Sequence, residues 1–312
     1  MIVAALCVYA AYVYNTSSTY TVSGQIYGTY WKITSTKYLD ISTQQKVRSE
    51  LNTIDLIASN YKDSSELSLI NKAKVGESIK VSKTLNYLLE VSGLVHYQTS
   101  GLFNITLGIE TSKMGFGPSL KEDIGSNNIR WINEAYTLDN QLITKHQQFH
   151  FDLSAIAKGY AVDQIAKLLI QEGYKNFVLD IGGELAVIGK KYDQPWTIAI
   201  QDPNNQGSNP IYIIEDETPI FIATSGEYRN YNYDRDGNKI THTIDPRTNS
   251  SIDPLGLSVS VKNNSSAMMA DAYATALNIM DVNEGLEFAN LNNIQVMYVT
   301  SDNILFSENW ND

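Results

Sequence analysis

The sequence is poor in cysteine and in basic residues, and each shortage argues against a class of protein or site. Cys7 is the only cysteine in 312 residues, so the chain can form neither an intrachain disulfide nor a thiolate metal cluster. Lys and Arg total 23 against 34 Asp and Glu, the formal net charge is −11, and no basic run is longer than a pair. Because proteins meet a nucleic-acid backbone with clustered positive charge, this composition argues against nucleic acid as a partner.

Long hydrophobic runs are also scarce, and the run at residues 2–14 stands apart from the rest of the chain. It is too short for an ordinary membrane-spanning helix but has the length of a signal-peptide core, although no Lys or Arg precedes it. We therefore expect an exported protein, periplasmic or anchored to the outer face of the inner membrane. Acylation of Cys7 is an alternative, but Leu6 is larger than the small residue that usually precedes an acylated cysteine, which disfavours it. Residues 15–20 have the composition of a polar linker.

The rest of the chain shows no internal repeat and no later low-complexity segment, and 43% of the residues are hydrophobic, which is enough for a core. We predict a leader and linker over residues 1–20 and one domain over residues 21–312. Strand pairs are mixed with helices rather than alternating strictly with them, which favours the α+β class.

Local patterns predict the individual elements. They are a strand over 25–35, a helix starting at the cap candidates Ser42 and Thr43, a helix over about 85–95, a strand over 143–151, a helix over 159–172, strands over 177–181 and 196–201, a hairpin of 228–233 and 239–244, a helix over 267–276 and a terminal hairpin of 294–300 and 304–306. His146 and His150 would share a face of the strand over 143–151, but no carboxylate or cysteine completes a metal site there.

Residues 152–163, DLSAIAKGYAVD, join a turn of small residues to a helix start that carries Lys158. Small side chains let a backbone approach a phosphate, and a helix N-terminus offers free N–H groups and a positive dipole end to an anion. The segment is consistent with a phosphate site, although a tight packed turn would look the same.

Several other segments of the chain contain short motifs whose order and spacing carry information about the family. They are residues 176–184 (NFVLDIGGE), 223–229 (ATSGEYR), 242–248 (HTIDPRT) and 267–276 (AMMADAYATA), with Tyr27-Gly-Thr29, residues 59–67 (SNYKDSSEL) and Gly115-Phe-Gly117 further upstream. Together with residues 152–163, they make the chain resemble the ApbE family, the FAD:protein FMN transferases. The resemblance runs from about Tyr27 to the C-terminus.

The resemblance implies a compact, T-fold-like α+β domain with mixed or antiparallel sheets and packed helices, in two lobes around a cleft. It implies Mg²⁺-dependent transfer of FMN from FAD, the substrate, to a Thr or Ser hydroxyl of a target protein through a phosphoester bond, with release of AMP. The expected acceptor is a membrane or periplasmic redox protein with an Asp-x-x-Ser/Thr-Gly-Ala-Ser/Thr type motif. This chain contains no such motif, so modification in trans is expected.

A metal pair is expected on the helix over 267–276. Asp271 and Thr275 lie four residues apart, so both oxygens point to one face, and hard oxygen ligands suit Mg²⁺. The alternative is an acid that caps a core helix and a threonine that bonds back to its own backbone. The family resemblance favours the metal and adds the carbonyl of Ala155 as a ligand.

Flavin nucleotide contacts are implied by resemblance at nine positions: Tyr27, Tyr61, Gly115, Phe116, Gly117, Asp152, Lys158, Tyr228 and Ile244. Rings and apolar side chains would bind the planar flavin and adenine, and Lys158 would lie near the pyrophosphate. Ordinary core packing is the competing explanation for the aromatic members, since the chain has 20 tyrosines. Tyr27 stands where the family usually has Met.

His242 is the expected general base, because an imidazole titrates near neutrality and can take a proton from a hydroxyl. It opens the His-x-x-Asp-Pro-Arg-Thr motif, with Thr241 where some family members have a second histidine. Two alternatives use the same residues: an FAD pyrophosphatase that releases FMN and AMP, and an FAD-binding protein without turnover. An electron-transfer flavoenzyme is disfavoured because no Gly-x-Gly-x-x-Gly follows a first strand.

Overall fold

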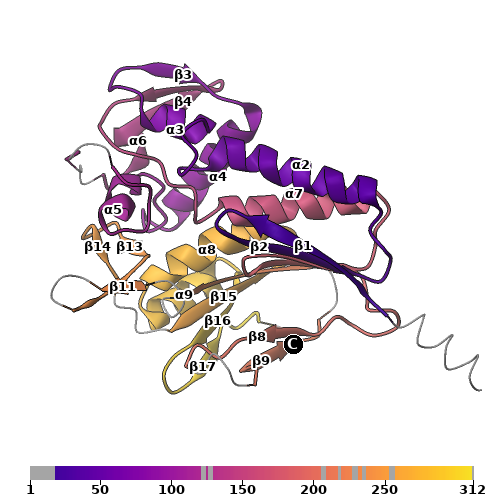
Figure 1. Cartoon of the computed structure of the whole chain (residues 1–312). Helices are drawn as coiled ribbons and strands as arrows, with labels where there is room; N and C mark the ends of the chain where they lie inside the picture. Colours follow the sequence, from indigo (N-terminus) through magenta and orange to yellow (C-terminus); the bar gives the residue numbers. More distant parts are fainter. Residues whose placement is uncertain are drawn as a thin grey trace, which may run out of the picture.

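The computed structural model describes residues 18–120, 124–125, 129–204, 209–216, 219–226, 231–233, 237–252 and 257–310. Its centre is a sheet of eight strands in the order β1-β2-β6-β7-β10-β15-β16-β17, in which every neighbouring pair is antiparallel (Figure 1). The strands are β1 (Tyr20–Ile26), β2 (Thr29–Ser35), β6 (Phe177–Ile181), β7 (Glu184–Ile188), β10 (Ile220–Gly226), β15 (Ser258–Asn263), β16 (Gln295–Val299) and β17 (Ile304–Phe306). The predicted α+β class is confirmed.

Helices cover one face of this sheet. They are α2 (Ile41–Ala58), α3 (Glu66–Asn71), α4 (Lys83–Gln98), α5 (Gly108–Lys113), α6 (Ile132–Ala135), α7 (Ala157–Gln171), α8 (Ala267–Ile279) and α9 (Val282–Leu291). Helices α7 and α8 pack directly on the sheet, and α2 packs on α7 (Figure 1). Period-two burial explains the arrangement, since Phe177, Leu179 and Ile181 alternate along β6 and are fully buried in the helical core.

The other face of the sheet has a smaller apolar cluster. A hairpin of β8 (Ile198–Ile200) and β9 (Tyr212–Ile214) lies below the sheet in Figure 1 and buries Ile198, Ile200 and Ile214 in a cluster with Val187, Ile222 and Val299. Since both faces are covered, the central strands are buried on both sides. This explains why β10 reads as a nearly continuous run of apolar and small residues, and why Ser258 to Lys262 of β15 are all buried although serines alternate with valines there.

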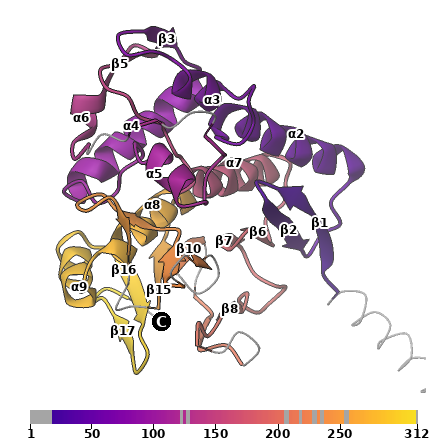
Figure 2. The same ribbon diagram turned by 60° about the vertical axis from the view of Figure 1, so that its left-hand side comes forward.

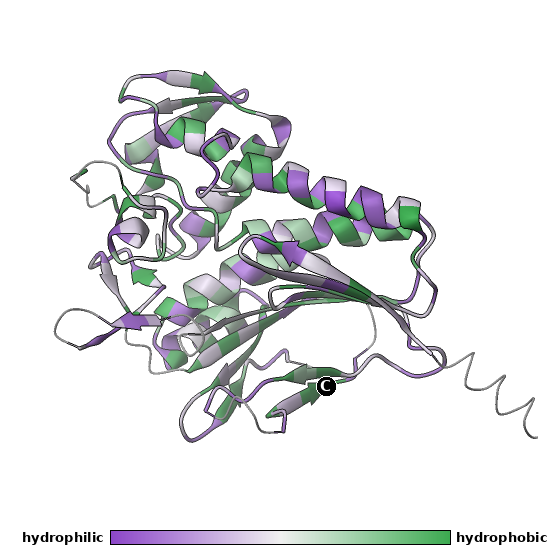
Figure 3. Cartoon of the chain, in the orientation of Figure 1, coloured by the Kyte–Doolittle hydropathy of each residue, from purple (hydrophilic) through white to green (hydrophobic). Residues whose placement is uncertain are grey.

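The part of the chain above α2 and α4 carries a further sheet of β3 (Ser78–Lys80), β5 (Leu142–Lys145) and β4 (Tyr136–Asp139) (Figure 2). Short two-stranded sheets pair β11 (Tyr231–Tyr233) with β12 (Lys239–Thr241) and β13 (Ile244–Asp245) with β14 (Ser250–Ser251). Helix α2 exposes a hydrophilic outer face and turns Val47, Leu51 and Ile54 inward (Figure 3). No helix of the described ranges is long and apolar enough to cross a membrane.

Three local predictions are wrong. The predicted strand over 25–35 is the end of β1, a turn at Tyr27 and Gly28, and β2. Helix α2 is capped by Asp40, whose Oδ1 accepts from the Thr43 N–H at 2.8 Å, and not by Ser42 or Thr43.

The third error concerns the strand over 143–151, which ends at Lys145. His146 is exposed, and His150 belongs only to an isolated bridge with Leu107. The two histidines therefore do not share a strand face. The domain boundary near residue 20 stays a prediction.

Candidate active site

A cavity of about 640 Å³ collects the predicted site residues. Segments far apart in the sequence line it: the β1–β2 turn, the α2–α3 loop, residues near α5, the start of α7, the end of β10, residues 242–244 and one face of α8. Figure 2 shows α5, α7, α8 and β10 near one another in the centre of the molecule. Ten of the thirteen predicted residues line it: Tyr27, Tyr61, Phe116, Asp152, Ala155, Lys158, His242, Ile244, Asp271 and Thr275. Tyr228 lies outside the described residues, and Gly115 and Gly117 do not line the cavity.

Two adjacent hairpin turns form one wall of the cavity. Tyr27 and Gly28 join β1 to β2 with φ of 52° and 71°, and Gly182 and Gly183 join β6 to β7 with φ of 64° and 110°. Positive φ at both central residues is the geometry that suits the twist of a two-residue hairpin. The paired glycines are thus a strand-end turn, and because β2 pairs with β6, this turn also brings Gly182 to the cavity.

Tyr27 is a bulky residue at positive φ, a backbone conformation that costs free energy. Its hydroxyl donates to the Leu51 carbonyl of α2 at 2.9 Å, which holds the ring against the cavity. Burial, and then the nearby carboxylates of Asp55 and Glu50, raise the pKa of Tyr27, so this hydroxyl stays protonated. The tyrosine at the family's Met position therefore keeps a place in the cavity wall.

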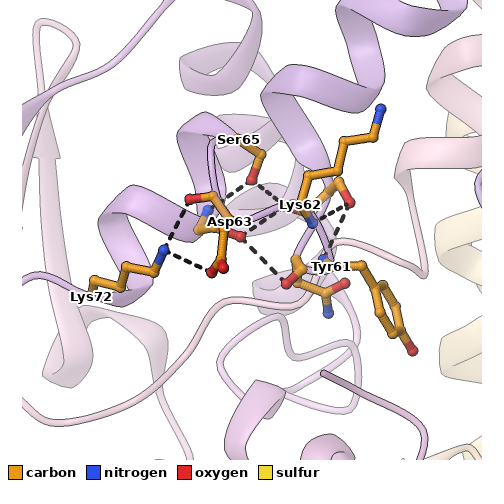
Figure 4. A network of polar contacts seen from close by, with 8 residues as sticks. Tyr61, Lys62, Asp63, Ser65 and Lys72 are labelled. Carbon is orange, nitrogen blue, oxygen red and sulfur yellow. Dashed lines mark hydrogen bonds and ion pairs between the residues drawn. The ribbon is translucent and has the colours of Figure 1, made fainter. Parts of the chain in front are cut away.

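A polar network shapes the loop that carries Tyr61 (Figure 4). Ser59 Oγ accepts from the backbone N–H groups of Tyr61 and Lys62, at 3.2 and 3.3 Å, and the Ser59 carbonyl accepts from the Ser65 hydroxyl. Lys72 closes the loop by donating to the Asp63 carbonyl and carboxylate, both at 2.9 Å. The loop thus fixes the backbone from which Tyr61 reaches the cavity.

Tyr61 is 66% exposed, and its hydroxyl donates to the Phe116 carbonyl at 2.6 Å. Phe116 in turn lies edge-on to His242, with 6.2 Å between ring centroids. The neighbouring glycines have backbone roles: Gly115 has a φ of 85°, and a Cβ on Gly117 would lie 2.5 Å from the Ser112 hydroxyl oxygen. These glycines let the chain present Phe116 to the cavity.

His242 lies between the end of β12 at Thr241 and the start of β13 at Ile244, rather than on a strand as expected. The turn that follows is braced by Arg247, whose Nε and Nη2 donate to the two carboxylate oxygens of Asp245 at 3.0 and 2.8 Å. A bidentate pair of this kind fixes orientation as well as distance. The motif therefore holds His242 at the cavity wall.

The start of α7 is capped by another helix. Ile156, its N-cap residue, supplies no side-chain hydrogen bond, and the Gly159 N–H donates to Asp271 Oδ2 of α8 at 3.0 Å. A carboxylate at a helix N-terminus is favourable for the helix dipole. One of the N–H groups that the sequence suggested for a phosphate is thus occupied by Asp271. The same contact sets Ala155 and Lys158 beside α8.

Three charged groups meet at this point: Glu184 and Asp271 are buried, and the Lys158 side chain is 29% exposed. Lys158 Nζ lies 2.5 Å from Glu184 Oε1, and Asp271 is close enough to act on both groups. Burial alone would lower the pKa of Lys158, but the carboxylates of Glu184 and Asp271 raise it, so the ammonium stays charged. Burial raises the pKa of Glu184 and of Asp271, and Lys158 opposes both shifts.

Glu184 is a site residue that the sequence reasoning missed. It is 3% exposed, lines the cavity and opens β7, whose remaining residues are apolar. A charged residue at an inward position of an apolar strand, directly after the paired glycines, was the available signal.

The residues at this point fit a divalent cation. Asp271 and Thr275 lie one turn apart on α8, and both line the cavity with Ala155, so carboxylate, hydroxyl and carbonyl oxygens are available. Two carboxylates face one ammonium, and Glu184 Oε2 has no hydrogen-bond partner among the described residues. An uncompensated buried negative charge is costly, and a cation would offset it. The described ranges contain no group of three or more His, Cys, Asp or Glu side chains that could hold a metal ion, so a site here would depend on the hydroxyl and carbonyl oxygens as well.

Comparison with known proteins identifies the family. The model of the ApbE family matches residues 27–298. The chain belongs to the ApbE family. The FAD:protein FMN transferase of Vibrio cholerae is 33% identical over 301 residues, 92% of this chain and 89% of the relative, and that of Haemophilus influenzae is 32% identical over 90% and 87%. The solved structure of flavin transferase ApbE from Vibrio cholerae has a TM-score of 0.82 at 29% identity and covers 94% of this chain and 98% of that chain.

Proposed function

We propose that this ApbE-family protein is a Mg²⁺-dependent enzyme that transfers FMN from FAD to a Thr or Ser hydroxyl of another protein and releases AMP. The class of enzyme, a transferase that moves FMN from FAD to a protein, follows from the curated relatives. The observation that carries the proposal for this chain is the cavity, which gathers a histidine, a lysine and a set of oxygen donors from distant segments.

The reaction needs a proton acceptor and a charge-neutralising pocket. His242 would take the proton of the acceptor hydroxyl, whose oxygen attacks the phosphorus of the FMN half of FAD. The new phosphoester bond forms as the pyrophosphate P–O bond breaks, and the bridging oxygen leaves with AMP. Lys158 would stabilise negative charge on the phosphate oxygens, since positioning and electrostatics dominate phosphoryl transfer.

Asp271, Thr275 and the Ala155 carbonyl would hold Mg²⁺. When bound, the ion supplies further neutralisation of the pyrophosphate charge. Tyr27, Tyr61, Phe116 and Ile244 would provide ring and apolar contacts to FAD around this centre, with Asp152 at the same wall.

The acceptor that we propose is a redox protein carrying the Asp-x-x-Ser/Thr-Gly-Ala-Ser/Thr type motif, in the periplasm or at the membrane. Tyr61 at 66% exposure shows that the cavity has an open rim, as a site that receives a segment of another protein requires. Export rests on the apolar residues 2–14 alone, which lie outside the described residues.

Intact-mass measurement of an acceptor domain with this motif, incubated with the protein, FAD and Mg²⁺, tests the proposal. We expect a gain of one FMN group, lost when Mg²⁺ is removed with a chelator and reduced by about 10²-fold or more in His242→Ala, the usual cost of removing a general base. His146→Ala is the matched control, because His146 is exposed and does not line the cavity.

Other outcomes would replace the proposal. FAD split to FMN and AMP with no mass gain on the acceptor would identify a pyrophosphatase. Tight FAD binding with neither product would identify a binding protein. An active His242→Ala variant would remove the assignment of the base while leaving the transferase in place.

A further inference from the structure

Glu184 is a buried carboxylate at the cavity, and its two oxygens have different surroundings. It is 3% exposed, its Oε1 lies 2.5 Å from Lys158 Nζ, and its Oε2 is buried without a hydrogen-bond partner among the described residues. Buried polar atoms are nearly always paired in native proteins, so an orphaned carboxylate oxygen next to a ligand cavity needs an explanation.

The ion pair of Lys262 and Asp216 does not line this cavity and serves as a comparison for the pair of Lys158 and Glu184. Lys262 on β15 pairs with Asp216, and the two side chains are 2% and 14% exposed. Lys262 also lies over the Trp310 ring, 4.6 Å from its centroid. No Asp216 oxygen is among the buried side-chain atoms of the described residues that lack a hydrogen-bond partner. At the cavity one ammonium serves two carboxylates, Glu184 and Asp271.

The hydrogen bonds of the two carboxylates support the same contrast. Asp271 Oδ2 is committed to the Gly159 N–H, and Glu184 Oε1 is committed to Lys158, so each carboxylate keeps one oxygen outside these contacts. A carboxylate that serves only to pair Lys158 would not need an unpaired second oxygen in a buried position. The arrangement is suited to a positively charged group with hydrogen-bond donors of its own.

We propose that Glu184 is a positioning residue of the Mg²⁺ site, an inference that rests on the proposed function. Its Oε1 would hold the Lys158 ammonium in place. Its Oε2 would accept a hydrogen bond from a water molecule of the bound cation. Mg²⁺ keeps several of its waters in proteins, and carboxylates that bind such waters orient the site and add to its affinity. Glu184 would therefore set cation affinity without being a direct ligand.

The test compares cation binding and FAD binding in variants without any acceptor protein. Glu184→Gln keeps the shape and one oxygen but removes the charge, Glu184→Asp keeps the charge on a shorter arm, and Asp216→Asn weakens the structural ion pair as a matched control. Mn²⁺ alone, followed by the loss of its free EPR signal, reports cation affinity, and flavin fluorescence reports the affinity for FAD without metal. Thermal unfolding shows whether each variant is folded.

We expect Glu184→Gln to weaken Mn²⁺ binding about ten-fold or more, with Glu184→Asp recovering part of the loss, as for other groups that orient a metal site. Metal-free FAD binding should stay within about three-fold or tighten, because the variant removes a negative charge near a pyrophosphate. Asp216→Asn should lower the melting temperature without changing either affinity.

Unchanged Mn²⁺ affinity in Glu184→Gln would overturn the proposal. A loss of about ten-fold or more in metal-free FAD affinity would overturn it too, because Oε2 would then bind a hydroxyl of FAD. If Glu184→Gln does not fold, Glu184→Asp decides, since the shorter arm should weaken Mn²⁺ binding and an unchanged affinity contradicts the proposal. Failure of the wild type to modify an acceptor would refute the proposed function alone, because neither binding measurement uses an acceptor.

Discussion

Tyr27 shows at the scale of one residue how a site tolerates a local cost. An ordinary two-residue hairpin of this geometry takes Asn or Gly at the first turn position, and Tyr27 holds a φ of 52° there instead. The hydrogen bond from its hydroxyl to the Leu51 carbonyl compensates in part, and the ring forms cavity wall. Residues in unfavourable backbone regions concentrate at binding sites for this reason.

Tyr27→Asn is predicted to separate stability from binding. The turn should relax by about 1 kcal/mol, which offsets much of the lost packing and hydrogen bond, so the free energy of unfolding should change by no more than about 1–2 kcal/mol. FAD affinity should fall about ten-fold, because a ring contact is worth about 1 kcal/mol or more. Urea unfolding and flavin fluorescence measure the two effects. FAD affinity equal to that of the wild type would show that the ring is not a contact.

Helices α7 and α8 approach each other closely at Gly159. A Cβ on Gly159 would lie 2.4 Å from the Ala267 carbonyl oxygen and 2.7 Å from Met268 Cα, both backbone atoms that cannot move aside cheaply. Asp163, one turn further along α7, accepts from the Ser266 hydroxyl and from the Ala267 N–H at 2.7 and 2.6 Å, and so caps α8. Each helix thus supplies a carboxylate to the N-terminus of the other.

Gly159→Ala should force the two helices apart. We expect a loss of about 2–4 kcal/mol in the free energy of unfolding, the usual range for overpacking against backbone. Metal affinity should fall as well, because Ala155 and Asp271 lie on the two separated segments. Gly93→Ala is the matched control: a Cβ on this helical glycine would lie 3.5 Å from Ile132 Cδ1, an ordinary contact, and the change should be neutral or stabilise by about 1 kcal/mol. Equal stability of the two variants would contradict the packing argument.

Elements with self-contained patterns were predictable from the sequence. Helices α7 and α8 and strand β6 carry their own periodicity, and they appear within a few residues of the expected ranges. The β1–β2 hairpin was missed because Tyr27 is not a turn residue and the alternation runs on through the turn. The pairing of β2 with β6 joins segments far apart in the sequence, and no local pattern specifies it.

The site was predictable to the extent that motifs carried it. The family motifs named ten residues that the fold brings to one cavity, although their roles remain predictions. Glu184 ends one of these motifs, but the motif alone assigns it no role, because its role depends on a partner, Lys158, on another element, and on an oxygen left unpaired among the described residues. Burial and pairing are properties of the folded chain, and a motif does not contain them.

At the scale of the whole molecule, a half-buried histidine, His150, lies near a buried lysine, Lys145, and the pair should contribute sensitivity to acid. Burial, and then the ammonium of Lys145, lower the pKa of His150 to about 4. Burial lowers the pKa of Lys145 to about 8; its Nζ donates to the Phe149 carbonyl at 2.9 Å. Both groups bind protons less readily in the folded protein than in the unfolded chain.

His150 should therefore contribute a fall in the free energy of unfolding as the pH drops from about 6.5 to about 4, and Glu184 and Asp271, whose pKa values burial raises, act in the opposite direction. In this window the unfolded chain takes up a proton at His150 that the folded protein does not, which lowers stability by up to about 3 kcal/mol. Urea unfolding at a series of pH values measures the slope. His150→Gln should reduce it, and His146→Gln, at an exposed position, should leave it unchanged. An undiminished slope in His150→Gln would assign the acid sensitivity to other groups.

Asp271 has a structural contact and a proposed ligand role, and the two complicate the interpretation of an inactive variant. One oxygen of this residue holds the first turn of α7, and the residue is also the expected metal ligand. An Asp271→Ala variant could lose activity because a metal ligand is missing or because the first turn of α7 is loosened. Loss of activity in this variant alone therefore does not identify the metal site. Thr275, in the interior of α8, caps no helix and gives the cleaner diagnosis. A substitution at residue 271 would therefore alter the first turn of α7 and the proposed metal site at the same time.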